Sequence, residues 1–144
     1  RENGLDLVFI DTPPKVERLS QAAVRQADIA VIPCGPTVDD IEALEPSIEI
    51  VRRAKATGVL VLNDGRPGSP INDQAAKVLA DYQLPICPHF IMHRAVIADS
   101  FIDGRTVLEV NPQSRGAQEI GDSWRWIARK AGIASAKTPR RKKS

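Results

Sequence analysis

Short apolar runs alternate with amphipathic helical patterns along the chain. Four runs predict strands, the last a short edge strand because of its prolines: LDLVFID (5–11), IAVIP (29–33), VLVLN (59–63) and PICPHFI (85–91). Apolar residues at helical spacing predict helices over VERLSQAAVRQ (16–26), residues 39–55, residues 71–82 and AVIADSFI (95–102). Pro46 interrupts the second of these helices, so we expect a kink or a restart there.

A last helix is predicted from a stripe of apolar residues between Asn111-Pro112 and Gly132, namely Ala117, Ile120, Trp124 and Ile127. Strands that alternate with helices predict a parallel sheet, and strands that are apolar on both faces predict a sheet covered on both sides. The predicted fold class is therefore α/β, a doubly wound and mostly parallel sheet. Ligands bind such sheets outside the carboxyl ends of the strands, so Asp11 and Asn63 are expected at one rim.

The composition is that of an ordinary globular protein, with 144 residues, 42% of them hydrophobic, and charges of both signs. No stretch approaches the roughly 18 consecutive apolar residues of a membrane helix. The first residues, RENGLDLV, lack the features of a signal peptide, which predicts a cytoplasmic protein. Cys34 and Cys87 lie in separate apolar segments without a CxxC pattern, so buried free thiols are favoured over a disulfide or a zinc site.

The net charge of +2 comes from the end of the chain. KTPRRKKS (137–144) holds five Lys and Arg and no acid, and without it 15 basic residues stand against 18 acidic ones. Such a basic segment is either a solvated terminus or a contact for nucleic acid or another polyanion. We therefore divide the chain into one domain, residues 1–132, and a flexible basic tail, residues 133–144.

The stretch VFIDTPP carries the clearest candidate chemistry. An Asp at the end of a strand can simply cap a turn, but a carboxylate at the ligand-binding rim also suits a hydrated Mg²⁺ beside phosphates. Thr12 could add a hydroxyl, and Pro13 and Pro14 keep the following loop extended.

Taken in order, five segments give the chain a family resemblance: LDLVFIDTPP, ADIAVIPCGPTVDDIEAL, VLVLN, a loop near FIMHRA, and DGRTVLEVNPQSRGAQEI. Over residues 5–130 it resembles the C-terminal two-thirds of the ParA family of partition ATPases, P-loop proteins of the ParA/MinD superfamily with a deviant Walker A loop. The likeness is greatest to short members without an N-terminal DNA-binding domain. IDTPP is the most specific piece, because a Walker B aspartate followed by Thr-Pro-Pro is habitual in that family.

One departure from the family is as informative as the match. The family's KGGxGKT loop cradles phosphates with backbone amides and lysines, and this chain contains no Gly-Lys pair. The chain also begins without Met, almost at the Walker B strand. We therefore expect the P-loop strand and helix, and the switch I aspartate, to lie upstream in the intact protein. The chain would then be a fragment or a truncated gene product, inactive alone although its parent is an ATPase.

The resemblance implies roles for residues at the rim. Asp11 would hold Mg²⁺ through water, and the DTPP loop (11–14), with Thr12 and Pro13 in it, would act as the switch that senses the γ-phosphate of ATP. Asn63 would contact the adenine, although it could equally be a turn residue that ends its strand. Met92 and His93 match the position of a second adenine-side loop, where the family usually has Pro-Arg-Asn. His93 has no partner visible in the sequence, which speaks against a catalytic base.

The resemblance also implies a DNA-binding surface. Its candidate residues are the arginines of the body and the cations of the tail, unless they are simply solvated: Arg94, Arg105, Arg115, Arg140, Arg141, Lys142 and Lys143. In the family, ATP and Mg²⁺ join two subunits, the homodimer binds DNA without sequence preference, and a ParB-like centromere-binding protein stimulates hydrolysis. The implied protein partitions plasmids or chromosomes and is cytoplasmic, nucleoid-associated and not bound to a membrane.

Three other interpretations stay open at this point. A MinD-like division-site ATPase needs a C-terminal amphipathic helix, and RKAGIASAKTPRRKKS is poor in large apolar residues. A non-enzymatic remnant without a P-loop would bind no ATP. An amidotransferase-coupled synthetase of the same fold would need substrate-site residues, and the sequence offers none that we recognise.

Overall fold

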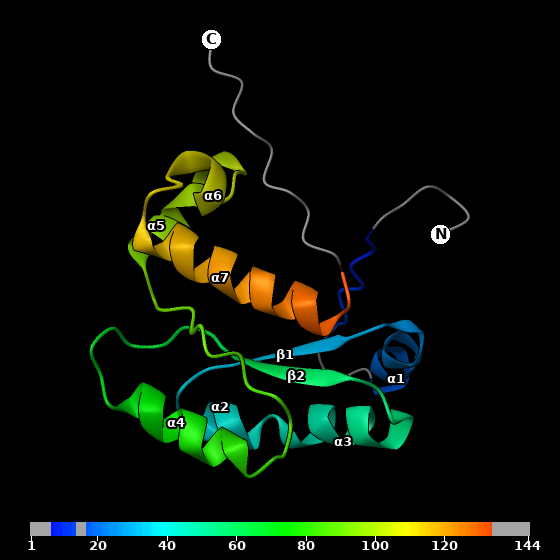
Figure 1. The fold of residues 1–144 in the computed structure, drawn as a ribbon. Helices are drawn as coiled ribbons and strands as arrows, with labels where there is room; N and C mark the ends of the chain where they lie inside the picture. Colours follow the sequence, from blue (N-terminus) through cyan, green and yellow to red (C-terminus); the bar gives the residue numbers. More distant parts are fainter. Residues whose placement is uncertain (1–6, 14–16, 134–144) are drawn as a thin grey trace.

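The computed structural model describes residues 7–13 and 17–133. Helices predominate, and two of the elements are strands (Figure 1). In chain order the elements are α1 (Glu17–Gln26), β1 (Ala30–Cys34), α2 (Val38–Glu42), α3 (Glu45–Ala54), β2 (Gly58–Leu62), α4 (Ile71–Ala80), α5 (Ala95–Ser100), the 3₁₀ helix η1 (Phe101–Asp103), α6 (Val107–Val110) and α7 (Arg115–Lys130).

The two strands are parallel neighbours, in register from Ala30 opposite Gly58 to Cys34 opposite Leu62. The segment 85–92 lies along the other edge of β2, where an isolated parallel bridge joins Leu60 to Ile86. A second isolated bridge joins Gly65, in the loop after β2, to Met92. The predicted edge strand 85–91 is therefore wrong as a continuous strand. Proline has no N–H to donate to a ladder, so the prolines of PICPHFI limit the segment to separate bridges.

The coarse fold prediction is confirmed, because helices alternate with parallel strands. In Figure 1, α2, α3 and α4 lie on one side of the strands and α7 lies on the other. The sheet that the described residues form has two strands, however, so it is not the doubly wound sheet that the sequence predicts. None of the helices in the described part of the chain is both long and apolar enough to cross a membrane.

The main hydrophobic core fills the space between the strands and α2, α3 and α4. Its largest fully buried side chains include Ile48, Leu60, Leu62 and Leu79. Val59 and Val61 point to the opposite face of β2 and are buried as well, because all five residues of this strand are covered. A strand covered on both faces is the pattern that the apolar run VLVL predicts.

The first predicted strand, 5–11, is wrong over its described residues. Residues 7–13 have no regular structure, and Phe9 is 77% exposed. The Phe9 ring lies 5.9 Å from the ring of Trp124 on α7 instead of within the sheet. A strand needs a hydrogen-bonded neighbour, and the ladder and bridges of the described residues all involve other segments.

The helix predictions are largely confirmed. The predicted restart falls between α2 and α3, with Pro46 in the first turn of α3, where its missing N–H costs nothing. The last helix begins later than the Asn111-Pro112 signal suggests, because Ser114 caps it by accepting a hydrogen bond from the N–H of Ala117.

Helix α6 was not predicted; it is four residues long and begins with a capping box of Thr106 and Glu109. Hydrogen bonds donated by Thr106 lower the pKa of Glu109.

Both cysteines are free and buried, as the sequence predicts. Burial, together with the nearby carboxylate of Asp40, raises the pKa of Cys34 to about 11. The thiol of Cys34 therefore stays protonated, and unreactive, at neutral pH.

Candidate functional site

The candidate site lies at the carboxyl end of β2. Asn63 follows the last residue of the strand, and its backbone N–H donates a 2.8 Å hydrogen bond to the carbonyl of Cys34, which ends β1. This bond extends the parallel ladder by one step and fixes the backbone of Asn63 where the two strands end. The Asn63 side chain is exposed there.

A second loop lies directly against the first. The N–H of Gly65 donates to the carbonyl of Ile91 (3.0 Å), and the N–H of His93 donates to the carbonyl of Gly65 (2.7 Å). These bonds form the bridge between Gly65 and Met92. The loop after β2 and the segment 91–93, which the resemblance assigns to one ligand, are thus neighbours in the structure.

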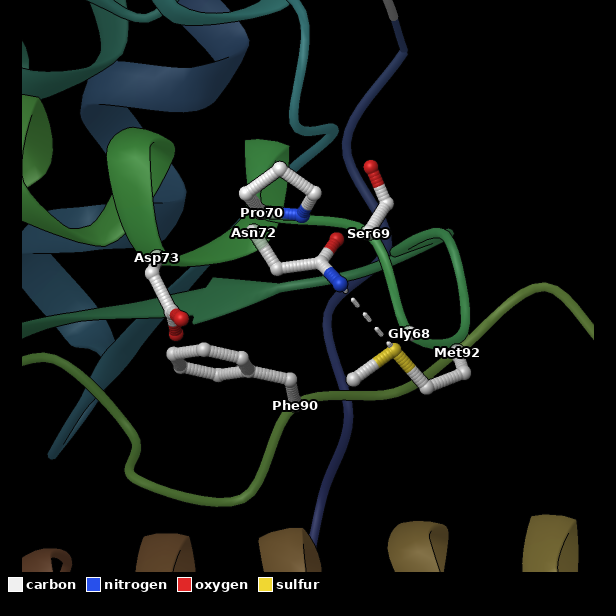
Figure 2. A pocket seen from close by; sticks show the side chains of 7 residues that line it. All are labelled: Gly68, Ser69, Pro70, Asn72, Asp73, Phe90 and Met92. Carbon is white, nitrogen blue, oxygen red and sulfur yellow. Dashed lines mark hydrogen bonds between the residues drawn. The ribbon is translucent and has the colours of Figure 1, made fainter.

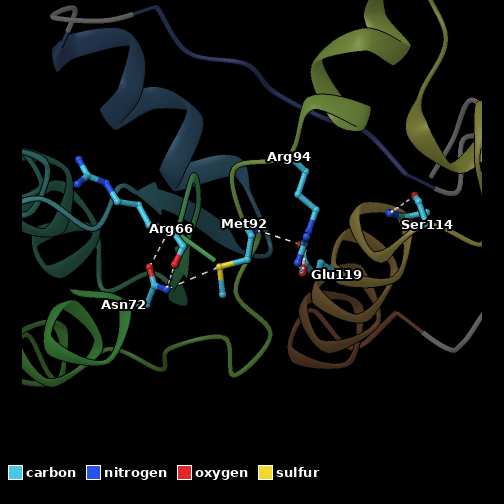
Figure 3. Close-up of polar contacts among 7 residues, drawn as sticks. Arg66, Asn72, Met92, Arg94, Ser114 and Glu119 are labelled. Carbon is cyan, nitrogen blue, oxygen red and sulfur yellow. Dashed lines mark hydrogen bonds and ion pairs between the residues drawn. The ribbon is translucent and has the colours of Figure 1, made fainter. Parts of the chain in front are cut away.

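Asn72, on the first turn of α4, fixes the shape of the first loop (Figure 3). Asn72 is 5% exposed; its Oδ1 accepts a hydrogen bond from the N–H of Arg66 (2.9 Å), and its Nδ2 donates one to the carbonyl of Arg66 (2.6 Å). Sequence reasoning missed this residue. The sequence pattern that could have identified Asn72 is its spacing: it lies three residues before Ala75 and seven before Leu79, which places a polar amide on the buried face of α4.

The two loops and α4 border an open pocket of about 430 Å³ (Figure 2). Its lining is Gly68, Ser69, Pro70, Asn72, Asp73, Phe90 and Met92. The ring of Phe90 and the thioether of Met92 supply apolar surface, while Ser69 and Asp73 supply a hydroxyl and a carboxylate. A few polar groups beside an aromatic wall are what a flat, partly polar ligand requires.

Gly65 is required for the close approach of the two loops. A Cβ at this position would lie 2.8 Å from Met92 Sδ and 3.0 Å from Asn72 Oδ1. Met92 could move, but two hydrogen bonds hold Asn72. We expect Gly65→Ala to lower the free energy of unfolding by about 1–3 kcal/mol in urea denaturation, as overpacking usually does.

Gly121→Ala is the matched control for this prediction. A Cβ at Gly121 meets only the flexible guanidinium of Arg125, at 3.4 Å. Alanine also favours a helix over glycine, so this variant should keep or slightly raise the stability. Equal effects of the two substitutions would show that the contact between the loops is not tight.

His93 has a partner that the sequence did not reveal. Its Nδ1 lies 2.6 Å from Oδ1 of Asp64, and both side chains are exposed at the rim. Asp64 adopts a left-handed backbone (φ 59°) at the start of the loop after β2. The pairing depends on the bridge between the loops, so the local sequence around Asp64 or His93 does not predict it.

Arg94 forms an ion pair with Glu119 of α7 (Figure 3). Its Nε lies 3.0 Å from each carboxylate oxygen and its Nη2 lies 2.5 Å from Oε1, with both side chains about one-fifth exposed. The hydrogen bonds that Arg94 donates to the carboxylate of Glu119 raise the pKa of Arg94. Arg94, the first of the predicted DNA-binding arginines, is therefore already paired within the protein.

Of the remaining predicted residues, none that the structure describes lines the pocket. Asp11, Thr12 and Pro13 are exposed, and no hydrogen bond or ion pair among the described residues joins Asp11 to the loops. Arg105 and Arg115 are exposed, on the connection to α6 and at the start of α7. Arg140, Arg141, Lys142 and Lys143 lie outside the described residues, as does Pro14.

Comparison with known proteins adds no identification: no family model matches the chain, and no curated protein matches it. Within residues 7–13 and 17–133, no group of three or more His, Cys, Asp or Glu side chains is arranged to hold a metal ion.

Proposed function

We propose that the chain is the C-terminal part of a ParA-like partition ATPase built on a doubly wound sheet. In this proposal the intact protein binds ATP and Mg²⁺, dimerises, and binds DNA without sequence preference. A ParB-like centromere-binding partner stimulates hydrolysis, which releases the DNA. The cycle positions a plasmid or a chromosome in a cytoplasmic, nucleoid-associated process.

The observation that carries the proposal is the junction of the two adenine-side loops. The resemblance assigns Asn63 and the pair Met92-His93 to one base, although they are far apart in the sequence. The bridge between Gly65 and Met92 holds these segments side by side at the carboxyl end of β2, the expected place for a ligand in an α/β sheet. The adjoining pocket, with the Phe90 ring as one wall, suits an aromatic base.

Asp11 is compatible with a magnesium ion held through water. Mg²⁺ keeps several water ligands and commonly binds through one or two carboxylates and substrate phosphates, so a three-carboxylate cluster is not needed. Asp11 offers one exposed carboxylate after an apolar run. When bound, Mg²⁺ would neutralise charge on the phosphates. The chain's own residues would position the ion and the base, without a covalent intermediate.

The proposal is tested on the protein as its gene encodes it. We expect an in-frame GGxGKT about 70–80 residues before Arg1, and ATP hydrolysis that a DNA-bound partner accelerates. A protein without ATP binding would be a non-enzymatic remnant and would overturn the proposal. ATP-dependent co-sedimentation with liposomes instead of DNA would favour a MinD-like ATPase.

A further inference from the structure

Glu119 contacts the backbone and a side chain on the two sides of His93. Its Oε2 accepts a hydrogen bond from the N–H of Met92 (3.2 Å), and its carboxylate holds the guanidinium of Arg94. His93, between them, reaches out to Asp64 across the rim (Figure 3 shows the Glu119 contacts). One carboxylate on α7 thus fixes both neighbours of a predicted adenine-side residue.

A second contact from α7 supports the same segment. Ser123, one helical turn after Glu119, is 2% exposed and donates a 2.6 Å hydrogen bond to the carbonyl of His89. Residues four apart lie on the same face of a helix, so α7 presents Glu119 and Ser123 together to residues 89–94. Ser123 contacts the beginning of this segment, at His89, whereas Glu119 contacts its end, at Met92 and Arg94.

We propose that Glu119 is a positioning residue that holds the loop 91–93 against the loop after β2, and so couples α7 to the bound base. This inference rests on the proposed function for the identity of the ligand. Glu119 touches no ligand in this account; it acts through Met92 and Arg94. A protein or DNA contact that shifts α7 would therefore change the position of the loop 91–93 through the contacts of Glu119 with Met92 and Arg94.

Glu119→Gln tests the inference with little change of shape. The amide keeps an acceptor for Met92 but loses the charge that pairs with Arg94, and charge-assisted hydrogen bonds are the stronger kind. The matched control is Asp122→Asn on the same helix, because Asp122 pairs with Arg125 and not with the loop. Both proteins are first compared by thermal denaturation with the wild type.

The first readout is amide hydrogen exchange without nucleotide. We expect the amides of Met92 and His93 to exchange about ten-fold faster in Glu119→Gln, and at the wild-type rate in Asp122→Asn. Glu119→Ala removes both contacts, so it should accelerate the exchange of these amides more than Glu119→Gln does. Unchanged exchange in Glu119→Ala would overturn the inference whether or not the protein binds ATP.

The second readout is steady-state ATP hydrolysis. Because the loop is assigned to the base and not to the phosphates, Glu119→Gln should raise KM for ATP about ten-fold and leave kcat within two-fold. A lower kcat with an unchanged KM would contradict the positioning role. If the wild-type protein binds no ATP, the proposed function fails, and hydrogen exchange alone decides the role of Glu119.

Discussion

Replacing Asp11 by asparagine is expected to lower the rate of Mg²⁺-dependent ATP hydrolysis about 10²–10³-fold in the protein as its gene encodes it. The reason is electrostatic, because the substitution removes the one carboxylate assigned to the hydrated ion, and phosphoryl transfer depends on stabilised charge. Binding of the base should change little, since Asn63 and Met92 lie on loops that have no hydrogen bond to Asp11. Steady-state phosphate release at saturating ATP measures the effect.

Asp28→Asn is the control for this experiment. Asp28 is an exposed aspartate between α1 and β1 and has no proposed role. Its replacement therefore removes one negative charge, as Asp11→Asn does, without touching the proposed magnesium site. It should leave kcat unchanged. If Asp11→Asn hydrolyses ATP within a few-fold of the wild type, Asp11 is not the residue that positions Mg²⁺.

Deleting residues 137–144 is expected to weaken non-specific DNA binding and to flatten its dependence on salt. The deletion removes five Lys and Arg. Each phosphate contact that is lost reduces the slope of log K against log salt by about 0.9. Fluorescence anisotropy with a duplex of arbitrary sequence, measured at several salt concentrations with ATP present, gives the slope.

A length-matched variant separates charge from chain length. Replacing Arg140, Arg141, Lys142 and Lys143 by glutamine should reproduce most of the deletion's effect, because phosphate contacts depend on charge. ATP hydrolysis in the absence of DNA should stay at the wild-type level in both variants. An unchanged slope would remove the tail from the DNA-binding surface and leave Arg105 and Arg115 as its candidates.

Much of the fold could be predicted from local patterns. The apolar run IAVIP corresponds to β1 within a residue, and the period of the stripe around Ile120 predicts the middle of α7. Pro46 marks the restart of a helix because its effect on the backbone is local. The run VFI shows the limit of such patterns. It is as apolar as β2, but a strand forms only where another strand supplies hydrogen bonds, and the described chain pairs none with it.

The candidate site was predictable in its position but not in its supporting contacts. Asn63 ends an apolar run, and this alone placed it at the carboxyl end of a strand. Asp64 and Glu119 gave no comparable signal, because each acts on a loop that is distant in the sequence. Glu119 lies on an amphipathic helix among other charged residues, where a carboxylate is ordinarily solvated, and only the packing of α7 shows its pairing with Arg94.

The central claim is that a nucleotide binds at the junction of the loop after β2 and the segment 90–93. Photoaffinity labelling with 8-azido-ATP and Mg²⁺, followed by peptide mapping, tests it most directly on the protein as its gene encodes it. We expect a saturable label within residues 63–73 or 90–94 that excess ATP prevents. A saturable label confined to other segments, or no label that ATP displaces, would contradict it.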